Sequence, residues 1–430
     1  MKVYIHTHGC RLNAAESRFF AEALESRGYE IARAMDGTVD CAVVNSCAVT
    51  EQAESKCKQT LRQIIRTQPD VLLVVTGCLA EKNPHMLLDL HRRILVLGNA
   101  EKHRVADYLE RYSTAGNGPE IVHKPIENAS FTLPCLLDRP YARRYNLKIQ
   151  EGCDFGCSYC IIPRLRGRAR SRDFRNLVED AAIHVARGVK EIILTGVNVG
   201  TYRNDSKKLA DVIAELGAIP GLARIRLSSI EFGTISDEIL SQMADPGSKL
   251  VKYLHMPIQS GSDRILRLMG RRYGIAAVGD YLGDVAKRIP GIGLGTDLMV
   301  GFPGESGRDF ECSVELLEGS PLQYAHIFSY SPREGTAAGA MEGQWVNRRE
   351  IERRSEALRA VSREKRYQFL ERQVGQCEEV LFEDPGESGF AGFTEHYAKV
   401  LVKNSAENLR NQMRRVHLVK NCGTFLLGEL

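Results

Sequence analysis

Three cysteines in the segment Glu151 to Arg172, EGCDFGCSYCIIPRLRGRARSR, have a spacing that suits a metal centre. Cys153, Cys157 and Cys160 form a C-x3-C-x2-C array, and no fourth cysteine follows before Cys312. A structural zinc site closes its coordination with four protein ligands, and a ferredoxin-type cluster also uses four cysteines. The array therefore predicts a centre with three thiolate ligands and one open metal position.

An open metal position allows such a centre to bind a ligand and react with it. Three thiolates on a [4Fe-4S] cluster leave one iron free, and that iron can chelate the amino and carboxylate groups of S-adenosylmethionine (SAM). An electron from the cluster can then cleave the sulfonium to a 5′-deoxyadenosyl radical. The candidate chemistry of the array is thus reductive cleavage of SAM.

Three further cysteines, Cys10, Cys47 and Cys78, each follow an apolar run, and those runs are VYIH, CAVVN and VLLVV. Apolar runs alternate with helical patterns from Met1 to about Tyr112, which predicts a parallel α/β sheet. The carboxyl ends of the strands in such a sheet lie along one edge, where ligands bind. We therefore expect the three cysteines to converge in space; the alternative is three unrelated buried thiols.

The other six cysteines are interpreted as ordinary small side chains. They are Cys41, Cys57, Cys135, Cys312, Cys377 and Cys422. In a chain of 430 residues without an export signal, clustered cysteines indicate metal or redox chemistry before disulfides.

Composition places the chain among soluble globular proteins. Hydrophobic residues make up 43% and charged residues 26%, and the length suggests two to three domains. No apolar run approaches the roughly 18 residues that span a bilayer, so we expect a cytoplasmic protein without a membrane partner. The formal charge of +4 permits a nucleic-acid partner without requiring one.

The pattern along the chain predicts an α/β protein of three parts. Residues 1–135 form the parallel α/β domain, with an irregular linker from about residue 113. Residues 136–372 hold six strand-like runs separated by amphipathic helices, which predicts a partial (β/α)6 barrel whose active face is the carboxyl end of its strands. Residues 373–430 contain short strand-like runs between Gly, Pro and Asn, which predicts a small β-barrel.

Placed on this framework, the C-x3-C-x2-C array, with Tyr159 before its last cysteine, resembles the radical SAM superfamily. The blocks QEGCDFGCSYCIIPRLRGRARSR, LTGVNVG, RLSSIE, HMPIQSGSDRILRLMGR and GTDLMVGFPGES resemble its methylthiotransferase family, as do THGCRLNAAES, VVNSCAVTEQAESK and VTGCLAE. The blocks VLFE, GFTEHYAKV and VHLV resemble the TRAM domain of that family, a small RNA-binding β-barrel. The resemblance runs across nearly the whole chain.

The resemblance implies an enzyme that uses SAM and two [4Fe-4S] clusters. The C-x3-C-x2-C array would hold the radical-generating cluster, and the three scattered cysteines would hold a second cluster that binds or supplies sulfur. One SAM would methylate that sulfur, and another would give the radical that abstracts hydrogen from an unreactive carbon. The implied SAM contacts, which could instead only shape the strand ends, are Tyr159, Gly196, Asn198, Ser228, Gln259, Asp297 and Gly301. No catalytic base is identified.

Within the family, the chain is most similar to the branch that methylthiolates C2 of N6-threonylcarbamoyladenosine next to the anticodon of tRNA. The segments that carry this choice are NSCAVTEQAESK and GCRLN, where Arg11 replaces the lysine of Gly-Cys-Lys-Val/Leu-Asn. The branch for isopentenyladenosine usually has Gly-Cys-Gln-Met-Asn, and the branch for an aspartate of a ribosomal protein has Gly-Cys-Pro-Lys-Asn. Those two substrates are the alternatives, with a non-catalytic iron-sulfur RNA-binding protein as a third.

Five arginines at alternate positions follow the array: Arg164, Arg166, Arg168, Arg170 and Arg172. Phosphate contacts would position an RNA there, while unstacked loop bases remain available for selection. We therefore predict an RNA-binding strip with the anticodon loop of tRNA as its partner; the alternative is that some of these arginines pair with the SAM carboxylate or with acidic barrel residues.

The residues from Val374 onward include eight acidic and six basic side chains, a balance that suits RNA poorly and keeps a protein substrate open. An external electron donor and a sulfur donor are the other implied partners.

Overall fold

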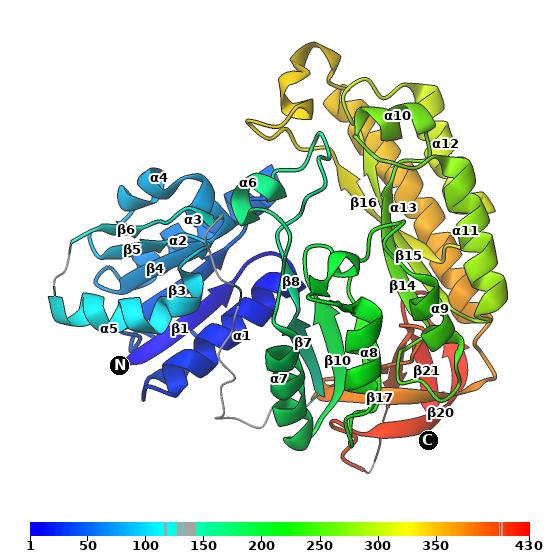
Figure 1. Cartoon of the computed structure of the whole chain (residues 1–430), viewed down its shortest axis with the longest axis horizontal. Coiled ribbons are helices and arrows are strands. Elements are labelled where there is room, and N and C mark those ends of the chain that lie inside the picture. Colours follow the sequence, from blue (N-terminus) through cyan, green and yellow to red (C-terminus); the bar gives the residue numbers. More distant parts are fainter. Residues whose placement is uncertain (116–117, 127–130, 132–142, 404, 406) are drawn as a thin grey trace.

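The computed structural model describes residues 1–115, 118–126, 131, 143–403, 405 and 407–430. Its elements form three parts that follow one another along the chain (Figure 1). The predicted α/β class is confirmed. Cys135 lies outside the described residues, as does most of the second half of the expected linker.

The amino-terminal part is a parallel sheet in the order β2-β1-β3-β4-β5-β6. Its strands are β1 (Lys2–Thr7), β2 (Glu30–Ala32), β3 (Cys41–Ser46), β4 (Leu72–Gly77), β5 (Ile94–Leu97) and β6 (Glu120–Val122). Its helices are α1 (Arg11–Glu25), α2 (Glu51–Thr67), α3 (Cys78–Lys82), α4 (Pro84–Leu88) and α5 (Val105–Ala115), with the 3-10 turn η1 (Lys102–Arg104).

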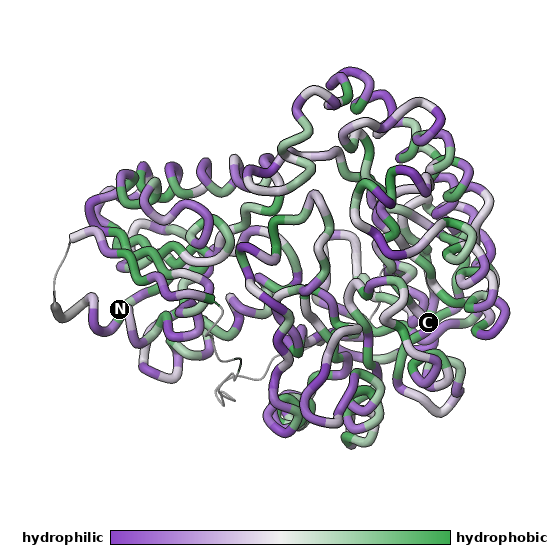
Figure 2. Tube along the Cα trace, turned by 45° about the horizontal axis from the view of Figure 1, so that its top comes forward, coloured by the Kyte–Doolittle hydropathy of each residue, from purple (hydrophilic) through white to green (hydrophobic). Residues whose placement is uncertain are grey.

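Helices cover both faces of this sheet. Every residue of β3 and β4 is buried, as expected of strands covered on both sides. Phe20 of α1 and Leu109 of α5 pack on one face, whereas Leu61 of α2 and Leu87 of α4 pack on the other. Figure 2 shows hydrophobic strands between helices that carry many hydrophilic residues.

The structure corrects the expected linker. After residue 113 the chain continues α5 to Ala115 and then forms β6, which pairs with β5 through Leu95 and Glu120. The sequence pattern also does not predict β2, which lies at the other edge of this sheet. Both strands are three residues long, which is too short for a hydrophobic period to show.

The central part holds parallel strands in two sheets, β13-β10-β7 and β14-β15-β16. A parallel bridge between Ile225 and Leu250 joins the sheets, so the strands follow chain order around a partial barrel. The predicted six-stranded partial barrel is therefore confirmed. Its strands are β7 (Arg143–Lys148), β10 (Val189–Thr195), β13 (Arg224–Leu227), β14 (Tyr253–Gln259), β15 (Gly293–Val300) and β16 (Tyr324–Ser329).

Helices and short elements surround this barrel. The helices are α6 (Ile162–Arg166), α7 (Phe174–Ala186), α8 (Leu209–Gly217), α9 (Asp237–Ala244), α10 (Asp263–Leu268), α11 (Ile275–Arg288), α12 (Gly307–Gly319) and α13 (Arg348–Glu371). The short elements are β8 (Gln150–Glu151), β9 (Arg170–Ser171), β11 (Arg203–Asn204), β12 (Lys207–Lys208), η3 (Val199–Thr201), η4 (Ala338–Ala340) and η5 (Glu342–Gln344).

The amino-terminal part lies beside the open side of the partial barrel, between β7 and β16. Helix α1 packs against β7 (Figure 1). Beyond the end of β16, Ser331 Oγ accepts a hydrogen bond from Glu51 N at 3.0 Å, and Arg333 pairs with Glu54 of α2 at 3.2 Å. The carboxyl ends of β3 and β16 are therefore neighbours.

The carboxyl-terminal part is a closed barrel in the order β17-β18-β19-β21-β20. Its strands are β17 (Cys377–Gly386), β18 (Gly389–Phe393), β19 (Lys399–Val402), β20 (Met413–Asn421) and β21 (Leu426–Glu429). Arg224, at the amino end of β13, donates to Phe393 O at 2.8 Å and Glu379 O at 2.7 Å. The small barrel therefore covers the amino ends of the central strands and leaves their carboxyl ends to the site described below.

No helix in the described part of the chain is long and apolar enough to cross a bilayer.

Candidate active site

Cys10, Cys47 and Cys78 lie at the carboxyl ends of three neighbouring strands. Cys10 caps α1 after β1, Cys47 directly follows β3, and Cys78 opens α3 directly after β4. Because β1, β3 and β4 are adjacent in the sheet, the three cysteines share one edge, as the strand pattern predicts.

Two glycines let the cysteine-bearing loops approach one another. Gly9 has φ +100°, and a Cβ there would lie 3.2 Å from the Sγ of Cys47. Gly77 has φ +90°, and a Cβ there would lie 2.5 Å from the carbonyl oxygen of Ser46. A side chain at either position would push the loops apart.

The thiols of this set influence one another. Burial, together with the neighbouring Cys78 and Cys10, raises the pKa of Cys47 to about 11. Arg166 opposes that rise. Because thiolate is the metal-binding form of cysteine, a positively charged centre held by all three would reverse the shift.

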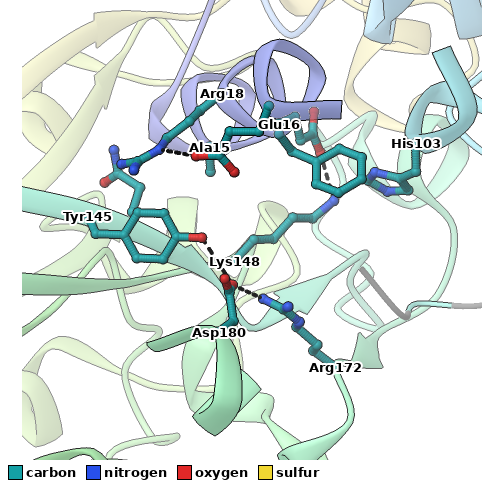
Figure 3. Close-up of a pocket in the computed structure, with 11 residues that line it drawn as sticks. Ala15, Glu16, Arg18, His103, Tyr145, Lys148, Arg172 and Asp180 are labelled. Atoms are coloured by element: carbon teal, nitrogen blue, oxygen red, sulfur yellow. Dashed lines mark hydrogen bonds and ion pairs between the residues drawn. The ribbon is translucent and has the colours of Figure 1, made fainter. Parts of the chain in front are cut away.

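A buried charge network lies beside this cysteine set. Glu16 of α1 and Glu151 of β8 form ion pairs of 2.5 to 2.9 Å with three buried cations, which are Lys102, Lys148 and Arg166. Figure 3 shows Glu16 and Lys148 pointing toward each other. The network carries one positive charge in excess, which favours thiolates nearby.

Arg166 connects the network to the cysteines. Its Nη2 donates to Asn13 Oδ1 at 2.6 Å. Although burial opposes it, Glu16 raises the pKa of Arg166 well above its usual value, and Cys78 and Cys10 contribute to the rise. The guanidinium thus lies close to the sheet-edge thiols and stays charged.

Glu16→Gln is expected to lower the free energy of unfolding by about 3–5 kcal/mol, because three buried cations would share one remaining carboxylate. Thermal unfolding measures the effect. Glu352→Gln is the control, because Glu352 pairs with Arg348 on the surface, where both side chains are more than half exposed. If Glu16→Gln unfolded at the same temperature as Glu352→Gln, the buried charge network would not stabilise the fold.

Cys153, Cys157 and Cys160 lie on the loop between β8 and α6, past the carboxyl end of β7. Cys153 N donates to Gly167 O at 3.1 Å. At the other end, Ser158 N donates to Met269 O at 3.0 Å, and Ser158 O accepts from Ala338 N at 2.8 Å. Segments from three regions of the chain therefore hold the loop.

The donor sets fit iron-sulfur clusters. Burial, followed by the neighbouring Cys157 and Cys153, raises the pKa of Cys160 to about 12. Each set offers three thiols, whereas a structural zinc site closes its coordination with four protein ligands. Three thiols suit a [4Fe-4S] cluster that keeps one iron open.

The two cysteine sets are neighbours. Ile161, directly after Cys160, packs with Leu165 of α6 into the same hydrophobic core as Cys78 and Leu79. Helix α6 then ends at the arginine of the buried network. The loop of one set is therefore anchored in the domain that carries the other.

The residues expected to contact SAM lie around the carboxyl ends of the central strands. Asn198 Nδ2 and Ser228 Oγ are buried and have no hydrogen-bond partner within the described ranges, so both can bind a ligand. Gln259, at the irregular end of β14, has φ +80°. Such backbone strain in a residue other than glycine concentrates at ligand sites.

The other expected SAM contacts are placed as follows. Tyr159 meets Phe302 edge to face, with ring centroids 6.5 Å apart. A Cβ on Gly196 would lie 2.8 Å from Gln150 Oε1, which also accepts from Asn198 N at 2.9 Å. Asp297 lies on β15, and Gly301 begins the turn after it with φ +76°. Ligand contact by these residues stays a prediction.

The arginine strip is not continuous. Arg166 belongs to the buried network, and Arg172 is 1% exposed and pairs with Asp180 of α7 at 2.7 Å (Figure 3). RNA binding by these two arginines was wrongly predicted, because a buried guanidinium cannot reach a phosphate. The pocket in Figure 3 measures only about 20 Å³, which suits a water molecule and not a nucleotide.

The other three arginines of the strip reach the surface to different degrees. Arg168 is 87% exposed and pairs with Asp154 at 3.1 Å. Arg164 is exposed, and Arg170 is half-buried. RNA contact by these three stays a prediction.

Apart from Asp297, sequence reasoning missed the side chains that line the lumen of the central barrel. We define the lumen wall as the side chains that alternate with core residues along β14 to β16, which are Tyr253, His255, Asp297, Tyr324, His326 and Phe328. The rings of His326 and Phe328 are exposed, with centroids 6.4 Å apart, and His255 lies 5.4 Å from His326. The alternating aromatics of YLHMPIQ and YAHIFSY carried this signal.

A cleft of about 310 Å³ opens beside Cys157. Phe155, Glu231, Arg271 and Tyr273 are among its lining residues, and Arg271 Nη1 pairs with Glu231. The cleft gives access to the cysteine loop.

The chain is similar to known proteins over nearly its whole length. Residues 147–317 match the Radical SAM superfamily, and residues 2–98 match Uncharacterized protein family UPF0004. Threonylcarbamoyladenosine tRNA methylthiotransferase MtaB of Bacillus subtilis (strain 168) is 34% identical over 429 residues, which cover 97% of this chain and 94% of the relative. The chain belongs to the radical SAM methylthiotransferase family, on the MtaB branch.

Two further similarities extend this result. The tRNA-2-methylthio-N(6)-dimethylallyladenosine synthase of Cereibacter sphaeroides (strain ATCC 17023) is 33% identical and covers 100% of this chain and 98% of the relative. The solved radical SAM methyltransferase TsrM of Kitasatospora setae, with cobalamin and a [4Fe-4S] cluster bound, has a TM-score of 0.58 at 14% identity and covers 79% of this chain and 77% of that chain. The second similarity concerns the fold alone.

Family membership settles the class of reaction. The protein is a radical SAM methylthiotransferase, and its cofactors are SAM and two [4Fe-4S] clusters. The non-catalytic alternative is therefore excluded.

Proposed function

We propose that this methylthiotransferase adds a methylthio group to C2 of N6-threonylcarbamoyladenosine next to the anticodon of tRNA. One observation carries the proposal: two sets of three cysteines lie beside each other, between a sheet edge and a barrel mouth. That arrangement supports a sulfur site and a radical site that act on one substrate.

Each cysteine set has its own task in this proposal. Cys153, Cys157 and Cys160 hold the cluster that supplies the electron for SAM cleavage. Cys10, Cys47 and Cys78 hold the cluster that carries sulfur, and the excess positive charge of the buried network stabilises their thiolates.

Other residues bind and orient the reactants. Asn198 and Ser228 offer buried polar atoms to SAM, and Gln259 is held by its strained backbone at the same barrel mouth. The lumen wall offers rings on which an unstacked base can stack. Arg164 and Arg168, next to the array, contact the phosphates that bring the base there.

The names of relatives support tRNA as the substrate, and two modified adenosines are the candidates. The MtaB relative of Bacillus subtilis is named for threonylcarbamoyladenosine. A relative of nearly equal identity is named for dimethylallyladenosine, which keeps that nucleoside as the second candidate.

Reconstituted enzyme with SAM, a reductant and a sulfide source tests the choice. Anticodon stem-loops carrying threonylcarbamoyladenosine, dimethylallyladenosine or unmodified adenosine are compared by mass spectrometry of their nucleosides. We expect a methylthio group on the first alone. A product on the dimethylallyl stem-loop alone would move the assignment to the second candidate.

The double change Arg164→Gln and Arg168→Gln is expected to weaken tRNA binding and to reduce the slope of log affinity against log salt by about 2, because each lost phosphate contact removes about one unit. Binding curves at several salt concentrations measure this. The change Arg348→Gln and Arg353→Gln on the exposed face of α13 removes the same charge and serves as control. An unchanged slope would remove the two arginines from the interface.

A further inference from the structure

We propose that Arg11 binds the carboxylate of the N6 substituent and thereby selects threonylcarbamoyladenosine. This inference rests on the proposed function. It assigns the recognition of one substrate group to one side chain.

Arg11 reaches from the amino-terminal part into the barrel lumen. It is the first residue of α1, directly after Cys10. Its Nη2 donates to the hydroxyl of Tyr397, and its guanidinium carbon lies 5.5 Å from the centre of that ring. Tyr397 in turn lies against Tyr253 of the lumen wall, with ring centroids 4.8 Å apart.

The charge of Arg11 is also felt by His326 of the same lumen wall. Burial, and then His255, lowers the pKa of His326, and Arg11 contributes to the same shift. The guanidinium therefore lies beside the lumen wall, and its contact with Tyr397 of the carboxyl-terminal barrel places it toward the strand ends that this barrel covers.

Within the described part of the chain, no carboxylate lies within ion-pair distance of Arg11, and its side-chain hydrogen bond is to the hydroxyl of Tyr397. Two other arginines of this region are paired, Arg226 with Glu191 at 2.8 Å and Arg144 with Glu383. Asp297 lies beside His255 at 3.3 Å. A half-buried guanidinium without a carboxylate suits an anionic group of a ligand, since its planar fork matches a carboxylate.

The chemistry of the substrate brings its carboxylate to this place. In adenine, C2 and the carbon that bears N6 flank the same ring nitrogen, N1. Sulfur delivered to C2 from the set of Cys10, Cys47 and Cys78 therefore approaches the edge of adenine that also carries the N6 substituent. The threonylcarbamoyl group has a carboxylate, whereas the dimethylallyl group is uncharged. Arg11 thus favours the threonylcarbamoyl group. Beside a dimethylallyl group, the charge of Arg11 would have no partner.

The test combines two enzymes with two substrates. Wild type and Arg11→Gln are each assayed on a stem-loop with threonylcarbamoyladenosine and on the same stem-loop with its carboxylate converted to the amide. The readouts are kcat/KM for the methylthio product and stem-loop affinity by fluorescence anisotropy without SAM. We expect wild type to prefer the carboxylate form by about 10- to 100-fold, the range of a hydrogen bond between charged groups, and Arg11→Gln to lose that preference.

Controls separate recognition from folding. Arg11→Lys keeps the charge and is expected to retain part of the preference, and Arg27→Gln removes an exposed arginine paired with Asp107 and is expected to retain all of it. Iron content and tRNA-independent SAM cleavage of Arg11→Gln should equal those of wild type. A preference that survives in Arg11→Gln, or equal losses on both stem-loops, would overturn the inference while leaving the proposed function intact. Failure of wild type on both stem-loops would overturn both.

Discussion

Cys157→Ala is expected to abolish reductive cleavage of SAM. Two remaining thiolates cannot hold a cluster with one iron open to SAM, so the yield of 5′-deoxyadenosine under reductant should fall by roughly a thousandfold or more, the scale seen when an essential catalytic group is removed. Chromatographic quantification of 5′-deoxyadenosine measures this without any tRNA.

The control for this change is Cys422→Ala, which removes an exposed thiol of the carboxyl-terminal barrel. It should cleave SAM at the wild-type rate. If Cys157→Ala formed 5′-deoxyadenosine as fast as this control, the array would not be the radical site.

Cys47→Ala is expected to separate the two halves of the reaction. The variant should lose about half of the bound iron, because one of two clusters loses a ligand. It should still form 5′-deoxyadenosine, since Cys153, Cys157 and Cys160 are intact, but it should place no methylthio group on tRNA. Iron analysis and nucleoside mass spectrometry measure the two effects together.

Cys41→Ala provides a matched control, because Cys41 is fully buried at the other end of the same strand, β3. It should keep its iron and its product. Retention of all iron by Cys47→Ala would refute a cluster at the sheet edge.

The hydrophobic pattern predicted the architecture because the buried strands are long enough to show it. The six central strands and the four longer amino-terminal strands each contain an apolar run, and the cysteines that end three of those runs meet at one edge. The three-residue strands β2 and β6 lie at the sheet edges and left no such run.

The site was predictable only where its residues are close in sequence or end a strand. Arg166 and Arg172 looked like surface charges because their partners lie far away or on another element: Glu16 is 150 positions from Arg166. Arg11 looked like a single difference in a motif, and its place in the lumen depends on Tyr397, 386 positions away. Local spacing carries no information about such partners.

Mass spectrometry of nucleosides from total tRNA, in cells without this protein and in cells in which it is restored, tests the central claim most directly. We predict that the methylthio group on threonylcarbamoyladenosine disappears in the first and returns in the second, while threonylcarbamoyladenosine without that group accumulates in its absence. Unchanged threonylcarbamoyladenosine modification in both would contradict the account.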